Sequence, residues 1–393
     1  MKVLMIAFGH PDNVLSLCAN LSQQVDLTLV FVLAGKEQYQ EGILQVKLQD
    51  QDYGLQEDPA YFQRTYPDSI VKFVGDNYRF LTLRLPSKKV RSLRNLRLFW
   101  SAISKLKKEP FDVVHYNGFS PYISLFYTRF KARAAQFWTL HDYINHSGEE
   151  NERALRINRT IAKMKKLTVI QHYEYLRQQV IQTFHLAPEK VRTLLSGPMN
   201  VFHTFSPRYD LCPEEDFILF FGRIKKYKGV DLLLDAHQRM NGSKPKLVVA
   251  GKGDWWFDPT PYEEDPDILF HRTYIENESL IGLIQRAQFI VVPYRDATHS
   301  AVIATAYAFD KPVVASDVDG LKEVVIDQQS GRLVQPSSVD SLKDVMEELT
   351  QKPELLEHYR SQIHREKEEG KIAWKTIIDN YVALYAEKLL HRP

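Results

Sequence analysis

Residues 296–320 read Asp-Ala-Thr-His-Ser-Ala-Val-Ile-Ala-Thr-Ala-Tyr-Ala-Phe-Asp-Lys-Pro-Val-Val-Ala-Ser-Asp-Val-Asp-Gly. Two apolar runs, 289–293 and 313–316, are each typical of a buried parallel strand. Between them, the small and apolar residues 301–309 predict a helix that is buried nearly all round. The stretch therefore predicts one strand–helix–strand unit of a doubly wound α/β sheet.

The N-terminus of this predicted helix is a candidate anion site. Thr298 and Ser300 are suitable N-caps, and the helix begins where a parallel strand ends. Its free N–H groups and the positive end of its dipole would then face a ligand, most often a phosphate. Ser300 and Ala301 have small side chains, which would let the ligand approach the backbone. The alternative is an ordinary strand–helix–strand unit without a ligand, and these residues alone favour neither.

The composition limits the classes of protein to consider. A chain of 393 residues is long enough for two domains, each with its own core. A net charge of +2 does not indicate a nucleic-acid partner. Cys18 and Cys212, the two cysteines, predict neither a disulfide framework nor a zinc site. No apolar stretch approaches the roughly 18–20 residues that span a bilayer, and we expect a cytoplasmic protein.

Strands and helices alternate along most of the chain. Residues 2–8, the loop at Gly9 and a helix to about residue 24 are a usual opening of a doubly wound domain, although no GxGxxG is present. Residues 35–80 are weakly patterned and predict an irregular insertion with short strands. Further strands are expected at 111–115, 135–140, 167–170, 191–195, 217–221, 246–250 and 268–271. Later helices are expected at 230–239, 280–287, 321–326, 341–349 and 372–390.

Residues 196–212 interrupt this alternation and are interpreted as an interdomain linker. We therefore expect an N-terminal domain at 1–200 and a second domain at 213–371. The terminal helix, within 372–393, is expected to cross back onto the first domain.

Residues 91–108 have clear helical periodicity. One face is apolar and carries Leu93, Leu96, Phe99, Trp100, Ile103 and Leu106. The other face is basic and carries Arg91, Arg94, Arg97, Lys105 and Lys108. Such a helix usually packs on its own sheet, with its charges in solvent. Together with the basic run 153–166, it could instead lie on an anionic membrane surface.

Three pieces of the second half carry a family resemblance: Gly222-Arg223 with Lys228-Gly229, Gly251-Lys-Gly253, and residues 306–325. In this order they resemble the C-terminal half of family-4-type glycosyltransferases, the glycosyl transferases group 1. The resemblance is strong over 215–335 and weaker before it, where Thr139-Leu-His-Asp142 is similar to a family signpost. It implies the glycosyltransferase-B architecture, in which two doubly wound Rossmann-like domains face each other across a cleft.

The resemblance also assigns roles to residues. Arg223 and Lys228 match the pair that holds the donor diphosphate, which suits an arginine fork and a lysine point charge. His141 matches a histidine that faces the transferred sugar, with Asp142 orienting its loop; His10, His115 and His146 are weaker candidates. The remaining expected donor contacts are Gly9, Gly251, Gly253, Tyr274, Ile275, Thr298, His299, Ser300, Ala301, Val302 and Thr305.

The chain departs from the family pattern at three places. Many members carry two glutamates eight positions apart, where this chain has Ala297 and Thr305, with Asp296 adjacent to the first. Phe309-Asp310 replaces the usual small residue and glycine of a helix C-cap, although Asp tolerates the left-handed conformation less well.

The implied function is a retaining glycosyltransferase of the hexosyl type. It would move a sugar from a UDP- or GDP-linked donor to a glycan or lipid-linked glycan, in cell-surface polysaccharide synthesis. The donor is a co-substrate, and neither cofactor nor metal is expected. The enzyme could be peripheral on the inner membrane face. The alternative is a degenerate member, lacking the glutamate pair, that binds sugar nucleotides or serves as a partner subunit. The same motifs disfavour a nucleotide-sugar epimerase.

Overall fold

The computed structural model describes residues 1–35, 38–48, 52–89, 92–141, 152–242, 244–298 and 300–390. Contacts divide the chain into two compact units. Among the described residues, unit 1 contains those of 1–141, 152–197 and 374–390, and unit 2 contains those of 198–373. The divisions follow Gly197 and Ala373, against expected domain limits of 1–200, 213–371 and 372–393.

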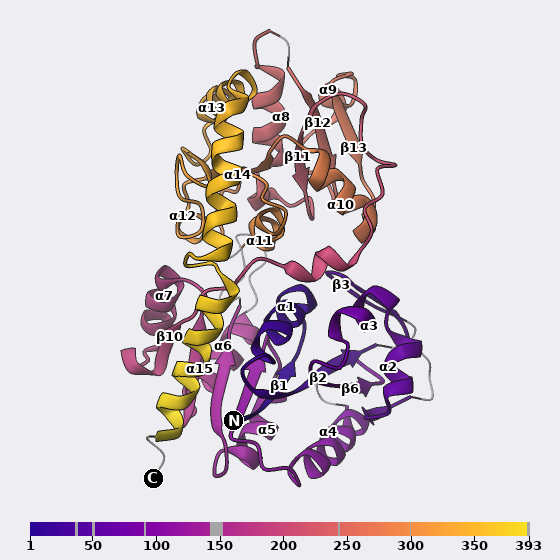
Figure 1. Ribbon diagram of the computed structural model, residues 1–393, viewed down its shortest axis with the longest axis vertical. Helices are drawn as coiled ribbons and strands as arrows, with labels where there is room; N and C mark the ends of the chain where they lie inside the picture. Colours follow the sequence, from indigo (N-terminus) through magenta and orange to yellow (C-terminus); the bar gives the residue numbers. More distant parts are fainter. Residues whose placement is uncertain are drawn as a thin grey trace. The chain divides into compact units, whose positions relative to one another are not determined.

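Unit 1 is built on an eight-stranded sheet (Figure 1). In spatial order its strands are β10 (Val191–Thr193), β9 (Leu167–Gln171), β8 (Ala135–Thr139), β7 (Val113–Asn117), β1 (Lys2–Ala7), β2 (Asp26–Ala34), β6 (Arg79–Leu85) and β5 (Gly54–Gln56). All neighbours pair in parallel except β5 and β6. The larger helices are α1 (Pro11–Leu21), α4 (Leu93–Leu106), α5 (Ile123–Phe130), α6 (Glu152–Ala162), α7 (Glu174–Phe184) and α15 (Trp374–Leu390).

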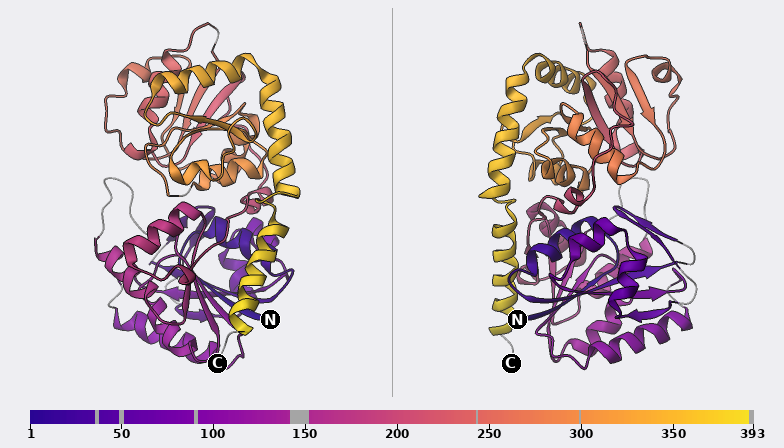
Figure 2. Two further views of the ribbon diagram at one scale, coloured as in Figure 1. Left: turned by 90° about the vertical axis from the view of Figure 1, so that its left-hand side faces the viewer. Right: turned by 45° about the vertical axis from the view of Figure 1, so that its right-hand side comes forward.

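Unit 2 is built on a six-stranded parallel sheet. Its order is β13 (Ile268–His271), β12 (Lys246–Ala250), β11 (Phe217–Phe221), β14 (Ile290–Val292), β15 (Val313–Ser316) and β16 (Gly331–Val334). Helices cover both faces of this sheet (Figures 1 and 2). The longer ones are α8 (Val230–Gln238), α10 (Asn277–Arg286), α11 (Ala301–Ala308), α13 (Val339–Gln351) and α14 (Pro353–Glu368).

The central strands are buried on both faces, which explains why they are continuous apolar runs. β11 is buried along its whole length, and so is β15. A strand covered by helices on both faces needs apolar side chains in both directions, so it shows no alternation. The predicted doubly wound architecture is confirmed for each unit.

The prediction for residues 35–80 is wrong in part. The short strands are present as β3 (Gln38–Glu41), β4 (Leu44–Lys47) and β5, but α2 (Pro59–Thr65) and α3 (Asp68–Val74) are helices. Asp58 caps α2 by accepting a hydrogen bond from the Ala60 N–H at 2.9 Å, and Gly75 ends α3 at φ 50°. These capping signals decide a segment whose apolar pattern is weak.

Two further differences concern unit 2. The expected helix 321–326 is a single turn, α12 (Asp319–Lys322), whereas α14 had not been predicted. Proline begins α14, and its buried Leu356, Tyr359 and Ile363 are spaced at helical intervals. Asp310, after α11, adopts φ 55°, and Lys367 contacts its carboxylate at 2.7 Å.

Helix α15 packs on unit 1, beside α1 and β8 (Figure 1). Its buried face carries Tyr381 and Tyr385. The Tyr385 hydroxyl lies 2.6 Å from Nδ1 of His115, whose Nε2 lies 2.8 Å from the Thr139 hydroxyl. Burial lowers the pKa of His115 to about 3, so this imidazole is neutral in the folded protein.

Over the described ranges, the structure contains no helix with both the length and the apolar composition that crossing a membrane requires.

His115 makes the stability of unit 1 depend on pH. An unfolded histidine binds a proton below about pH 6.5, whereas the buried His115 resists protonation down to about pH 3. Between these values the unfolded chain binds more protons, so the free energy of unfolding falls as the pH falls. The slope from this residue reaches about 1.4 kcal/mol per pH unit. Urea unfolding between pH 7 and pH 4 should show a shallower slope for His115→Gln than for wild type; equal slopes would contradict the assignment.

Candidate functional site

Unit 2 has a topological switch point between β11 and β14. From β11 the chain proceeds outward to β12 and β13, and from β14 it proceeds in the opposite direction to β15 and β16. Loops that leave neighbouring strands in opposite directions open a crevice at the carboxyl edge of the sheet, where α/β proteins bind ligands. The loops after β11 and β14 are therefore the first place to look for a site.

Glycines let the loops after β11 and β12 touch through their backbones. Gly222 has φ 121° and Gly251 has φ 154°, both in the region that favours glycine. A Cβ atom on Gly251 would lie 1.9 Å from the carbonyl oxygen of Gly222. A Cβ atom on Gly253 would lie 2.1 Å from the carbonyl oxygen of Ile224. Side chains at these positions would force the two loops apart.

Lys228 is a buried cation at the turn after β11. Lys228 is only 8% exposed, and its Nζ donates a hydrogen bond to the Tyr294 hydroxyl at 2.9 Å. Burial, with a smaller contribution from the charge of Arg223, lowers the pKa of Lys228 to about 8. In the part of the chain that the structure describes, no carboxylate oxygen lies within 4.0 Å of the cationic groups of Lys228 or Arg223. This turn therefore concentrates positive charge that an anion would neutralise.

The N-terminus of α11 lies beside this turn. Ser300 is its N-cap and accepts a hydrogen bond from the Ile303 N–H at 3.4 Å, as predicted. The Ser300 side chain also hydrogen-bonds with Tyr294, the partner of Lys228. Val302, in the first turn, approaches to 3.7 Å from the position of a Cβ on Gly222. The buried ammonium and the positive helix end therefore converge on one edge of the sheet.

The Thr305 side chain is shorter than that of a glutamate and carries no charge, so it cannot take a glutamate's role. The residue is 3% exposed, and its hydroxyl donates to the Ala301 carbonyl oxygen at 2.8 Å, with the Met199 sulfur at 3.5 Å. Ala297 is half-buried against the core. The two positions at which the family resemblance implies glutamates therefore offer no carboxylate here.

The other expected donor residues of unit 2 also follow strands at the carboxyl edge. Tyr274 and Ile275 come after β13, with Tyr274 38% exposed and Ile275 packed against the core. Thr298 follows β14, and its carbonyl oxygen lies 2.7 Å from the position of a Cβ on Gly320. His299 lies outside the described residues.

Two residues of this edge were missed by the sequence reasoning. Tyr294 links Lys228 to Ser300, and Arg295 forms a two-pronged ion pair with Asp231 of α8, at 2.8 and 2.6 Å. Both lie in the loop that follows β14. Their place just after a buried strand was the signal that could have identified them.

Unit 1 has its own switch point, between β1 and β7. Asn117 ends β7, and its Oδ1 lies 2.8 Å from Nε2 of His141, which follows β8 and is 5% exposed. This contact holds the His141 ring against the end of β7. His10 stacks on His141 with ring centroids 4.0 Å apart, and the His172 ring lies 5.0 Å away. Asn117 and His172 were not among the predicted residues.

The Glu41 carboxylate lies against the loop after β1. The His10 N–H donates to Oε1 of Glu41 at 2.8 Å, and the Tyr39 hydroxyl donates to Oε2 at 2.6 Å. Oε1 also lies 2.7 Å from the position of a Cβ on Gly9. The expected donor contact at Gly9 stays a prediction, and Glu41 stands where a bound anion would have to approach.

The structure places the weaker histidine candidates His115 and His10 in different surroundings. His115 is fully buried in β7 beneath α15, so it is a core residue and cannot face a sugar; that suggestion was wrong. His10 lies against His141 at the carboxyl edge. Asp142 and His146 lie outside the described residues.

Comparisons with known sequences point to one family. Residues 215–352 match the family described as Glycosyl transferases group 1. An uncharacterized glycosyltransferase of Methanocaldococcus jannaschii is 25% identical over 212 residues, covering 49% of this chain and 53% of that protein. A D-inositol 3-phosphate glycosyltransferase of Mycobacteroides abscessus is 30% identical over 147 residues, covering 36% and 33%. The matches thus span about half, or less, of these relatives' lengths.

Solved structures share the fold over nearly the whole chain. Sucrose-phosphate synthase from Thermosynechococcus elongatus has a TM-score of 0.68 and 17% identity, covering 100% of both chains. The Anabaena protein HepE in complex with UDP-glucose has a TM-score of 0.69 and 13% identity, covering 98% of this chain and 100% of that one. The resemblance seen in the sequence is confirmed: this chain has the glycosyltransferase-B fold, and its residues 215–352 match the glycosyl transferases group 1 family.

Proposed function

We propose that this protein transfers a hexose-type sugar from a UDP- or GDP-linked donor to a hydroxyl of a glycan or lipid-linked glycan, with retention. The observation that carries the proposal is the buried Lys228 ammonium beside the N-terminus of α11, at the switch point of unit 2. A diphosphate supplies the negative charge that this position lacks. A role in cell-surface polysaccharide synthesis would follow from such an acceptor.

The cations would act on the leaving group. Negative charge grows on the diphosphate as its bond to the anomeric carbon breaks, and fixed positive groups stabilise that charge most in a site with little water. Lys228 would contact the phosphate as a point charge, and the exposed Arg223 as a fork. The N–H groups at Ala301 and Val302 would bind the second phosphate.

The incoming hydroxyl would use the donor itself as its base. Its oxygen bonds to the anomeric carbon as the bond from that carbon to the phosphate oxygen breaks, and its proton moves to the leaving phosphate oxygen. His141 would contact a sugar hydroxyl, held in place by Asn117 and by the stacked His10. Asp142 would orient the same loop. Asn117 is then a positioning residue.

The comparisons support a first choice of donor. HepE, which shares the fold, has been solved with UDP-glucose, and that ligand belongs to HepE alone. We therefore propose UDP-glucose as the first donor to test, followed by other UDP- and GDP-sugars.

A second function is favoured by one observation. Neither Ala297 nor Thr305 offers a carboxylate, and the Thr305 hydroxyl is bonded to its own helix. A protein of this kind could bind a sugar nucleotide without turning it over, as a sensor or partner subunit. Slow donor hydrolysis distinguishes the two functions.

The first test is a donor screen followed by turnover in a chelator. No trio of His, Cys, Asp or Glu in the described ranges could hold a metal ion, and here the positive charge comes from Arg223, Lys228 and α11. At least one UDP- or GDP-sugar should raise the melting temperature of the protein. The protein should hydrolyse that donor at the same rate with and without EDTA. Binding without hydrolysis would favour the sensor. Activity abolished by EDTA and restored by magnesium would contradict the charge assignment.

The diphosphate contact is tested by two lysines of one turn. Lys228→Ala removes a charge-assisted contact of about 1.5–3 kcal/mol, so the donor Kd should rise about ten- to a hundredfold. Lys226→Ala, at an exposed position of the same turn, is the matched control and should bind normally. Calorimetric titration measures both. Equal affinities in the two variants would remove Lys228 from the site.

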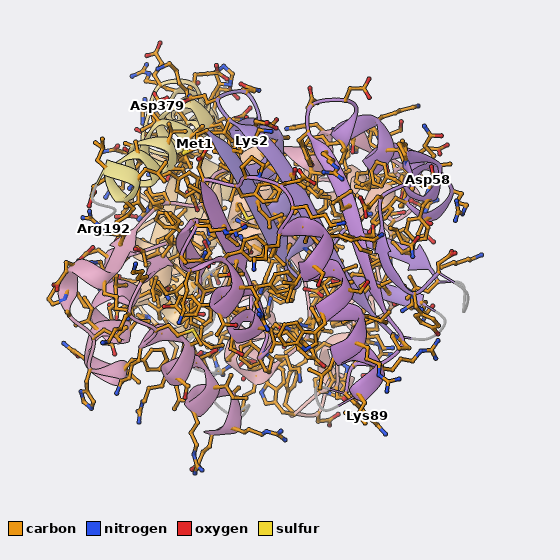
Figure 3. All side chains as sticks on the ribbon, turned by 90° about the horizontal axis from the view of Figure 1, so that it is seen from below. Met1, Lys2, Asp58, Lys89, Arg192 and Asp379 are labelled. Carbon is orange, nitrogen blue, oxygen red and sulfur yellow. The ribbon has the colours of Figure 1, made fainter. Side chains whose placement is uncertain are left out.

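We also propose reversible contact with an anionic membrane through α4. Leu93 is 74% exposed and Trp100 is 38% exposed, whereas Phe99 and Ile103 are buried. Exposed basic residues accompany them at Lys88, Lys89, Arg94 and Arg97, with Lys89 labelled in Figure 3. Apolar side chains flanked by cations suit the boundary between headgroups and acyl chains.

Co-sedimentation with vesicles tests the membrane contact. Binding should require phosphatidylglycerol and fade at high salt, because each cation near the surface contributes about 1 kcal/mol that salt screens. Leu93→Ala should weaken binding without lowering the melting temperature, since Leu93 is 74% exposed. A protein that ignores anionic vesicles at low ionic strength would point to an acceptor in solution.

A further inference from the structure

The amino edge of the unit 1 sheet contains a hollow of about 420 Å³. It lies where β8 and β9 begin, at the edge opposite to His141 and Asn117. Figure 3 views the structure from below, with Lys2, the first residue of β1, labelled at this edge. The site already proposed does not include any residue of this hollow.

Five lysines line the hollow, and they come from four separate segments. Lys131 follows α5, Lys165 and Lys166 precede β9, Lys190 ends the turn before β10, and Lys388 is in α15. Glu189 is the one acidic residue of the lining, so the lining carries a net charge of +4 (five lysines minus one glutamate).

Four of the five lysines have no carboxylate partner in the described part of the chain. Among the described residues, no carboxylate oxygen lies within 4.0 Å of the ammonium groups of Lys131, Lys165, Lys166 or Lys190. Lys388 lies 3.4 Å from Glu387. The Lys190 ammonium donates to the Met164 carbonyl oxygen at 2.7 Å, and burial lowers the pKa of Lys190.

A second hollow at the same edge shows the opposite arrangement. It has a volume of about 310 Å³ and lies where β1, β2 and β6 begin. Its two cations are both paired: Lys2 lies 3.6 Å from Asp26, and Arg79 lies 2.6 Å from Glu109. The chain thus neutralises its cations in one hollow and leaves an excess of positive charge in the other.

We propose that the lysine-lined hollow is a second anion site, which binds a phosphate-bearing group. A phosphate carries up to two charges on compact oxygens, which suits ammonium point charges better than a single carboxylate does. The volume is at the scale of a small-ligand pocket, about 300–1,000 Å³, and far below that of a nucleic-acid duplex. The phosphate could belong to a soluble metabolite or to a lipid headgroup.

Lysine footprinting of the intact protein locates this site directly. The rate of acetylation of each lysine would be measured by peptide mass spectrometry, with and without inorganic pyrophosphate. A second arm would use vesicles of phosphatidylglycerol and phosphatidylcholine, against phosphatidylcholine alone. We expect protection of Lys131, Lys165 and Lys166, whereas Lys2 and Lys72 should react at unchanged rates. Protection by pyrophosphate assigns a soluble phosphate; protection by anionic vesicles alone assigns a headgroup.

A pair of variants supplies the quantitative test. In the double variant Lys165→Ala with Lys166→Ala, the anion concentration that protects Lys131 should rise by about tenfold for each contact removed. Lys2→Ala with Lys72→Ala, also in unit 1, should not. Both variants should keep the wild-type melting temperature and donor binding, so a failure of the donor site cannot be mistaken for a failure here. No protection by either probe, or equal protection of Lys2 and Lys72, would overturn the proposal.

Discussion

The candidate site depends on one constraint, the burial of the Lys228 ammonium without a carboxylate partner among the described residues. Burying a charge costs free energy unless nearby groups compensate for lost water. Here the compensation is a neutral phenol: the Tyr294 hydroxyl at 2.9 Å, with the ring centroid 4.8 Å from Nζ. The glycines at 222 and 251 permit the turn that brings the lysine there. The phenol does not neutralise the positive charge of Lys228, so an anion can still bind to it.

Both units place polar groups at a switch point, but the chemistry differs. Unit 2 gathers cations and a helix N-terminus, which suit phosphate. Unit 1 gathers the His141 imidazole and the Asn117 amide, which suit hydroxyl groups, and Glu41 occupies the backbone donor at His10. In the reaction that we propose, unit 2 would hold the charged leaving group and unit 1 would hold sugar hydroxyls. The carboxyl edge of each sheet would serve the reaction, and the amino edge of unit 1 would serve a second anion.

Sequence patterns predicted what depends on local chemistry. The strands 217–221 and 313–316 were predictable because their apolar runs are continuous, and Ser300 was predictable because a cap is a local signal. Helices α2 and α3 were missed because their apolar spacing is weak. Helix α14 was missed because most of its residues are polar or charged, although Leu356, Tyr359 and Ile363 are spaced at helical intervals. Asn117 contacts His141, which is 24 residues away in the sequence, and Tyr294 contacts Lys228, which is 66 residues away. No local sequence pattern predicts such contacts. The basic run before β9 was visible, but its convergence with Lys131 and Lys388 follows only from the fold.

The most direct measurement of the central claim is amide hydrogen exchange with and without saturating UDP-glucose or UDP. A diphosphate held by Lys228 and the N-terminus of α11 should slow exchange in the turn from Gly222 to Gly229 and in the first turn of α11. The turn before β9 at the amino edge of unit 1 serves as the internal reference. Binding that leaves both unit 2 segments unchanged, while calorimetry shows the nucleotide bound, would contradict the account.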